Sequence, residues 1–285
     1  MSINLGTIAH KKFEAEAIQA FQDMAKLRGT TRLRDAKNAN QVQFQVIGAT
    51  TAELRGAIQT PIPLADVTHT VAIATVKDFV IAEMTDIFKD NQTSVDERSE
   101  LVESMTSALG RRLDQIIIDE MVAATITKTV ADDIESSGTP DNLNVAMFNE
   151  SARLLGSDVP DTDRFMLVHD NGFYHFLREG DVKDIDINVT KALALGKVPE
   201  YHGFNILKIG DRKEGGLPGG KGLSATRKSF AWQKSAIGLA MNMNPKIRID
   251  YVPTHGAWIV TAFMSAGAVI IQTDGVVEIS TDELA

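Results

Sequence analysis

Cysteine is absent from the 285-residue chain. Without a thiol the protein can form neither disulfides nor thiolate metal sites, and it has no cysteine nucleophile for covalent catalysis. Apolar residues make up 44% of the chain, which is enough for a sizeable core. Packing within the chain, or contacts between copies of it, must therefore supply the stability.

A long hydrophobic run is also missing. The most apolar stretch, residues 258–271, is interrupted by Thr261 and Ser265 and is too short to cross a bilayer. The first 17 residues lack the charged-then-apolar order of a secretory signal. We expect a protein that has no membrane span and folds inside a cell.

Motifs for catalysis and metal binding are missing as well. There is no G-x-S-x-G elbow, and none of the 6 histidines forms an i, i+4 pair beside a glutamate. Two acidic pairs, Asp161 with Asp163 and Asp184 with Asp186, lack the glycine and glutamate of a calcium loop and are read as turn and cap residues. We expect no catalytic residue, no metal and no cofactor.

One glycine-rich segment, GGLPGGKG, offers a weak alternative. The spacing of Gly215 to Gly220 and Lys221 matches a phosphate-binding loop, but Gly222 stands where a magnesium-binding hydroxyl is required. A nucleotide-binding enzyme that uses this loop is therefore a remote alternative, and an exposed mobile loop over residues 210–228 is preferred.

The net charge of −9 is unevenly distributed. Residues 1–40 hold seven basic and four acidic residues, a net charge of +3 that leaves −12 for the remainder. An acidic body repels nucleic acid and argues against a reader of DNA sequence, whereas a basic N-terminal segment could face DNA.

The longest element that the sequence predicts is a helix from Ser94 to Ala124. Ser94 and Glu97 have the spacing of a capping box, and apolar residues then recur at intervals of three and four. The predicted apolar stripe consists of Leu101, Val102, Met105, Ala108, Leu109, Leu113, Ile116 and Ile117.

A long β-hairpin is predicted before this helix. Val42, Phe44 and Val46 alternate with glutamines, and a second run, residues 67–81, places Val67, Val71, Ile73 and Phe79 on one side. A two-stranded ribbon has no core of its own, so it must lie on a helix of its own chain or on another subunit.

The rest of the chain reads as an α/β segment followed by strands. We expect helices at 142–155, 171–179 and 187–195 and strands at 164–168 and 201–209, with a domain boundary at 136–140. Further strands are predicted at 246–252, 257–263, 268–271 and 276–280, separated by turns at Pro253, Gly267 and Gly275. The fold class is α+β.

The succession of these elements resembles the major capsid protein of tailed bacteriophages, with its Hong Kong 97-like fold. The stretches that carry the resemblance are TDIFKDNQTSVDERSELVESMTSALGRRLDQIIIDEM, FNESARLLGSDVPDTDRFMLVHDNGFYHFLRE, ALALGKVPEYHGFNILKIGD and AWQKSAIGLAMN. The resemblance implies an N-terminal arm (1–40), an extended loop (41–82), a peripheral domain with the spine helix (83–140), an axial domain (141–245) and strands that return to both domains (246–285).

The same resemblance implies a structural protein of the virion, assembled in the host cytoplasm as hexamers and pentamers of an icosahedral shell around double-stranded DNA. Expected partners are other copies of the chain, a separate scaffolding protein, a portal, decoration proteins as an option, and DNA held by non-specific contact. An encapsulin-type compartment is the alternative within the fold.

Inter-subunit contacts are hypothesised for four charged residues. Glu53 and Arg55 lie in the tip of the hairpin, and Arg111 and Arg112 in the long helix. The tip, residues 48–66, has no lysine, so the lysine–asparagine cross-link of some relatives is not expected here. The arm begins almost at once, which implies a separate scaffold or a chain already trimmed.

Overall fold

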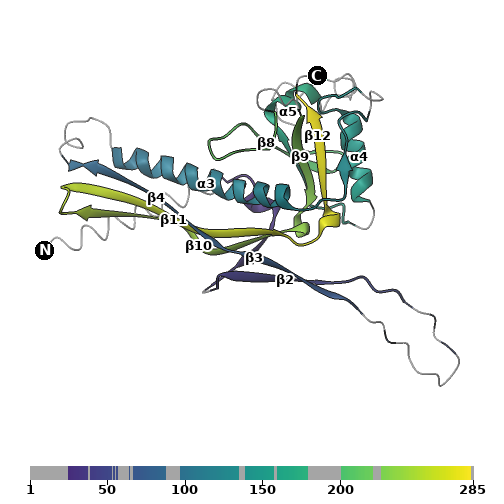
Figure 1. The fold of residues 1–285 in the computed structure, drawn as a ribbon, viewed down its shortest axis with the longest axis horizontal. Coiled ribbons are helices and arrows are strands. Elements are labelled where there is room, and N and C mark those ends of the chain that lie inside the picture. Colours follow the sequence, from purple (N-terminus) through teal and green to yellow (C-terminus); the bar gives the residue numbers. More distant parts are fainter. Residues whose placement is uncertain are drawn as a thin grey trace.

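The protein has an elongated layer with a compact lobe at one end, and a two-stranded ribbon runs below them (Figure 1). The fold is seen in a computed structural model. It describes residues 25–37, 39–52, 54, 56, 64, 67–87, 97–134, 139–156, 159–178, 200–220 and 226–283.

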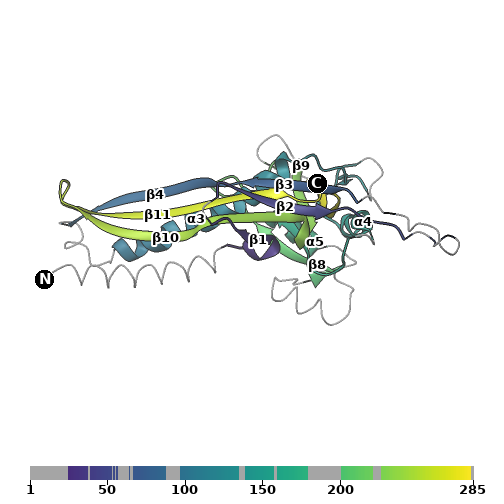
Figure 2. The same ribbon diagram turned by 90° about the horizontal axis from the view of Figure 1, so that it is seen from below.

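The elongated layer is a four-stranded sheet covered on one face by a long helix. Its strands have the order β1-β10-β11-β4, with bounds Arg32–Asp35, Ile237–Val252, Ala257–Ile270 and Lys77–Asp86. β1 is parallel to β10, and the other pairs are antiparallel. Figure 2 shows the long strands side by side, with the helix α3 behind them.

The helix α3, Glu97–Ala123, agrees with the sequence prediction; Ser94 lies outside the described residues. At a rise of about 1.5 Å per residue its 27 residues span roughly 40 Å. The predicted stripe is the face that packs on the sheet, where it meets Leu239, Ile247, Val260 and Met264 of β10 and β11. Because apolar residues recur every three and four positions, they lie on one face of α3 and form part of the main hydrophobic core.

In the part that the structure describes, the compact lobe is a six-stranded sheet with two helices. Its strands have the order β5-β12-β9-β6-β8-β7, with bounds Thr129–Val130, Val276–Asp282, Thr226–Gln233, Arg164–His169, Phe204–Ile209 and Glu200–Tyr201. The helices are α4, Val145–Leu155, and α5, Asp170–Phe176. Elsewhere in the described residues, short 3-10 helices occur at η1, Arg28–Thr30, η2, Lys234–Ala236, and η3, Thr273–Gly275.

The central strands of the compact lobe belong to two cores. Met166 and Ala231 pack with α4 and α5, whereas their neighbours Leu167 and Phe230 join the core under α3. Side chains alternate between the faces of a strand, so one strand can serve both cores. The long layer and the compact lobe are thus continuous through β6 and β9.

The ribbon consists of β2, Gln41–Ile47, paired antiparallel with β3, His69–Thr75. This confirms the predicted hairpin. Its inner face carries Val42, Phe44 and Ala74, which pack on Ala240 of β10. A Cβ on Gly238 of β10 would lie 2.8 Å from the Phe44 ring, so glycine is needed there for the ribbon to lie on the sheet.

Two expectations about strands are wrong. Residues 67–81 do not form one arm, because the chain changes sheet at Val76: β3 pairs with β2, and β4 pairs with β11. Phe79 consequently packs towards α3 rather than beside Ile73. The predicted turn at Gly267 is part of the continuous strand β11, where its missing side chain makes room for the Thr75 carbonyl.

Other predictions hold with small shifts. The first α/β helix begins at Val145, three residues late, because Asn144 caps it by accepting the Met147 N–H at 2.9 Å. The strand at 164–168 is confirmed as β6 and that at 201–209 as β7 and β8, while the helix at 171–179 ends earlier, at Phe176. The helix predicted at 187–195 lies outside the described residues.

Candidate functional site

Asp114 of α3 is a fully buried carboxylate that several segments of the chain contact. Its carboxylate accepts the Leu27 N–H at 2.9 Å and the Lys26 N–H at 3.4 Å, and it receives Arg212 Nη1 at 2.9 Å. Burial raises the pKa of Asp114, although these hydrogen bonds oppose the rise. One carboxylate thus joins residues 26–27, the helix α3 and the glycine-rich loop.

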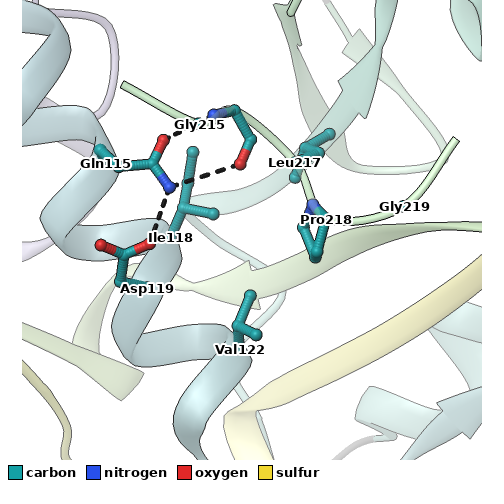
Figure 3. Close-up of a pocket in the computed structure, with 9 residues that line it drawn as sticks. Gln115, Ile118, Asp119, Val122, Gly215, Leu217, Pro218 and Gly219 are labelled. Carbon is teal, nitrogen blue, oxygen red and sulfur yellow. Dashed lines mark hydrogen bonds between the residues drawn. The ribbon is translucent and has the colours of Figure 1, made fainter. Parts of the chain in front are cut away.

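The described part of the glycine-rich loop, residues 210–220, is docked on α3 (Figure 3). Gly216 N–H donates to Gln115 Oε1 at 2.7 Å, and Gln115 Nε2 donates to Asp119 Oδ1 at 2.7 Å. Leu217 is buried in the main core. The expectation of an exposed loop is wrong for Gly216 and Leu217, which are buried, whereas Asp211, Lys213, Gly215 and Gly219 are exposed as expected.

This geometry does not support the alternative in which the glycine-rich loop binds the phosphates of a nucleotide. A cavity of about 330 Å³ lies between α3 and residues 215–219, with Ile118 and Val122 in its wall (Figure 3). A phosphate cradle needs free backbone N–H groups, but the Gly216 N–H is already bonded to Gln115. Lys221 lies outside the described residues. The loop holds the two parts of the fold together rather than presenting a nucleotide site.

The four hypothesised contact residues lie in different places. Glu53 and Arg55 are outside the described residues. Arg111 Nε lies 2.9 Å from Glu214 Oε1, and the Arg112 guanidinium lies 4.9 Å from the centre of the Phe79 ring. Both α3 arginines thus have partners in their own chain, and a role between subunits stays a prediction.

Sequence reasoning missed a buried ionic cluster at the end of the compact lobe. Arg227 of β9 is buried; its Nε lies 2.6 Å from Glu283 Oε1 and its Nη1 lies 3.1 Å from Asp211 Oδ1. Glu283 Oε1 is also 2.7 Å from Nδ1 of His169. The four residues follow no motif, and they meet because β9 pairs with both β12 and β6 while β6 pairs with β8.

Apolar side chains on the outer face of the ribbon have no cover in the single chain. Val71 and Ile73 of β3 are 49% and 47% exposed, and at the ribbon tip Leu54 and Leu64 are 96% and 95% exposed. The face thus differs from the expected wet face, since Gln45 pairs with Val71 and Gln43 with Ile73. Large apolar side chains exposed to this degree on one ribbon make it a candidate contact site.

The described part of the chain has neither a metal-binding cluster nor a membrane-spanning helix. No group of His, Asp and Glu there could hold a metal ion. Asp161 pairs with Arg164 Nη2 at 2.7 Å, and Asp184 and Asp186 lie outside the described residues. None of the helices that the structure describes has the length and hydropathy to cross a membrane.

Comparison by sequence finds one family. A family model described as phage capsid protein matches residues 5–283, almost the whole chain. A search of curated proteins finds no match.

Comparison by structure finds the same fold in phage heads. The capsid protein of cyanophage P-SCSP1u is 15% identical with a TM-score of 0.68, and the match covers 88% of this chain and 86% of that one. The acid-stable capsid of Helicobacter pylori bacteriophage KHP30 gives 11% identity and a TM-score of 0.72, and the match covers 89% of this chain and 88% of that one. The structure of Mycobacterium phage Che8 gives 15% identity and a TM-score of 0.62, and the match covers 91% of this chain and 90% of that one.

Proposed function

The chain belongs to the phage capsid protein family and has a Hong Kong 97-like fold, and on that basis we propose that its copies form the pentamers and hexamers of an icosahedral shell around double-stranded DNA. Its role as a major capsid protein is structural. We further propose that it catalyses no reaction, in keeping with the absence of any catalytic motif from its sequence.

The observation that carries the proposal is the half-covered ribbon. Phe44 and Ala74 hold its root on β10, while Val71, Ile73 and the tip leucines remain exposed. Covering apolar area is worth about 25 cal/mol per Å², offset in part by the cost of ordering the partners. A second copy laid against the outer face would bury these residues, and repetition of that contact would close a shell.

The proposed division of the chain follows the resemblance to the Hong Kong 97-like capsid fold. Residues 1–40 form the arm and 41–82 the extended loop over a neighbouring subunit. Residues 83–140 form the peripheral domain and 141–245 the axial domain around the five-fold and six-fold axes, and 246–285 return to both.

Four charged residues are proposed to act at subunit contacts. Glu53 and Arg55 would pair across the interface from the ribbon tip, and Arg111 and Arg112 would do so from α3. The partial exposure of the α3 arginines supports this role. Exposed ion pairs contribute at most about 1 kcal/mol each, so they would select register rather than hold the shell together.

Other partners follow from the proposed shell. A separate scaffolding protein, a portal and optional decoration proteins would assemble with the subunit in the host cytoplasm, and DNA would be held without sequence preference. An encapsulin-type compartment is not favoured, because the family model that matches is that of phage capsid proteins. Extraction of nucleic acid rather than cargo protein from purified particles would separate the two.

Electron microscopy of the purified full chain, with a scaffolding protein supplied if needed, tests the proposal. We expect closed shells built from five-fold and six-fold clusters. A compact, stable monomer that persists at high concentration in the presence of scaffold would contradict the proposal.

A further inference from the structure

A groove lined by positive charge lies where the arm enters the fold. It has a volume of about 750 Å³ and is lined by Ala25, Lys26, Arg28, Gly29, Thr31, Arg32, Leu33 and Lys234. Four of these eight residues are basic, and no acidic residue lines the groove among those that the structure describes. The concentration of one sign stands out in a chain whose net charge is −9.

The cations come from separate elements that the fold brings together. Lys26 and Arg28 precede and begin η1, Arg32 begins the edge strand β1, and Lys234 begins η2 about 200 residues later. Figure 2 shows β1 alongside β10, at the point where the long layer meets the compact lobe. The parallel pairing of Arg32 with Gly238 fixes this arrangement.

The backbone beneath the groove is rigidly held. Thr30 O accepts the indole N–H of Trp232 at 3.0 Å, and the Leu27 N–H is bonded to Asp114. Thr30 and Leu27 are both buried. The cationic side chains therefore project from a fixed platform, so binding an anion there would cost little ordering of the backbone.

Three of the four cations, Lys26, Arg32 and Lys234, make no ion pair within the described part of the chain. Lys26 and Arg32 are exposed, and Nζ of Lys26 donates to the backbone oxygen of Lys208, a neutral acceptor. Arg28 Nη2 donates to the side-chain oxygen of Asn244 at 3.2 Å.

We propose that this groove binds the sugar-phosphate backbone of packaged double-stranded DNA, a role that rests on the proposed shell function. A duplex carries one charge per about 1.7 Å of its axis, so it presents anions densely enough to engage several cations at once. The core of a protein–protein interface is depleted of charge, whereas half of the residues lining this groove are cationic. The contacts are to phosphate and carry no sequence preference.

Arg32 and Lys234 are the residues to change, because both line the groove and neither supports the core. The test uses the full chain as unassembled subunits, titrated onto a short fluorescent duplex over a series of salt concentrations. In Arg32→Gln with Lys234→Gln, two phosphate contacts are lost, so the slope of log K against log salt falls in magnitude by about 1.8. Arg32→Gln alone lowers it by about 0.9.

The matched control is Lys246→Gln with Arg248→Gln, two exposed residues of β10 that do not line the groove. This variant has the same net charge as the groove variant, and its slope should match that of the wild type. Equal slopes in the wild type and the groove variant, or equal losses in both variants, would overturn the proposal. Thermal unfolding of each variant confirms that the fold is intact before slopes are compared.

Two further outcomes separate the inference from its premise. If the groove variant binds DNA like the wild type but no longer associates with other copies, the groove receives an acidic protein surface and the DNA proposal is wrong. If the wild type forms no shells while the slope difference is observed, the shell proposal fails and the groove still binds duplex.

Discussion

The carboxylate of Asp114 links three segments of the chain. It is fully buried and bonded to Leu27, Lys26 and Arg212, which belong to two other segments of the chain. A buried charge is tolerated when its partners are fixed in this way, and it is costly to remove one partner from such a set. Asp114 therefore couples three elements through local electrostatics.

We predict that Asp114→Ala destabilises the subunit by about 3 to 5 kcal/mol, since it leaves the Arg212 guanidinium and the backbone N–H groups of Leu27 and Lys26 without their acceptor. Denaturant unfolding of the unassembled subunit measures the change. Asp119→Ala, on the exposed face of the same helix, is the control and should cost under about 1 kcal/mol. Similar losses for the two variants would contradict the assigned role.

The raised pKa of Asp114 predicts a pH dependence of stability. Because burial raises the pKa in the folded state above the unfolded value, the folded state binds the proton more tightly. The stability that protonated Asp114 contributes is fully present below the pKa of this group in the unfolded state. It is lost as pH rises through the pKa of Asp114 in the folded state. The free energy of unfolding of the wild type, relative to Asp114→Asn, should fall with rising pH across that window.

Unfolding titrations of the two proteins at a series of pH values measure this difference. If the free energy of unfolding of the wild type, relative to Asp114→Asn, rises with pH, the pairing with Arg212 outweighs burial and the pKa of Asp114 is lowered instead.

At the scale of the element, the ribbon combines a fixed root with an uncovered outer face. Phe44 lies over Gly238 and anchors the root, whereas the exposed Val71 and Ile73 add nothing to the core of their own subunit. The inner and outer faces of one hairpin therefore serve different purposes. Folding depends on the inner face, and in the proposed shell assembly depends on the outer face and the tip.

We predict that removing the distal part of the ribbon blocks assembly without unfolding the subunit. Replacing residues 48–68 by Asn-Gly joins Ile47 to His69, which already pair, through a favoured two-residue turn. Electron microscopy should show no shells, and circular dichroism should show a thermal transition close to that of the wild-type subunit.

A full-length ribbon with Leu54→Ser and Leu64→Ser serves as the companion variant. Loss of shells there as well would assign the contact to the apolar tip, whereas normal shells would assign it to ribbon length. Normal particles from the shortened ribbon would contradict the role proposed for the element.

At the scale of the whole molecule, assembly and stability are linked. The chain has no disulfide, and part of its apolar surface is covered only if copies overlap. Binding between folded copies stabilises the folded state by mass action, because the unfolded chain does not take part. Intersubunit burial would then take the place of covalent cross-links.

We therefore predict that assembled particles unfold at a higher temperature than isolated subunits. The midpoint of the subunits should rise with protein concentration under conditions that permit assembly. Calorimetry of the two fractions measures both effects. Identical, concentration-independent midpoints would show that the subunit is stable by itself and gains nothing from its neighbours.

The sequence by itself determined the elements whose periodicity is strong. The spacing of apolar residues predicted α3 to within a residue at its C-terminal end, and the alternation of Val42 and Phe44 with glutamines predicted the hairpin and its inner face. The order of elements also indicated the family. These features are local, so a pattern over ten to thirty residues is sufficient to reveal them.

Only the tertiary structure decided which distant residues meet. Val76, where the chain passes from one sheet to another, carries no turn signal, and Leu217 fixes a loop that its glycines mark as mobile. Arg32 and Lys234 line one groove because β1 pairs with β10, which no local pattern indicates. Pairing and burial depend on partners far along the chain, and periodicity within a segment does not encode them.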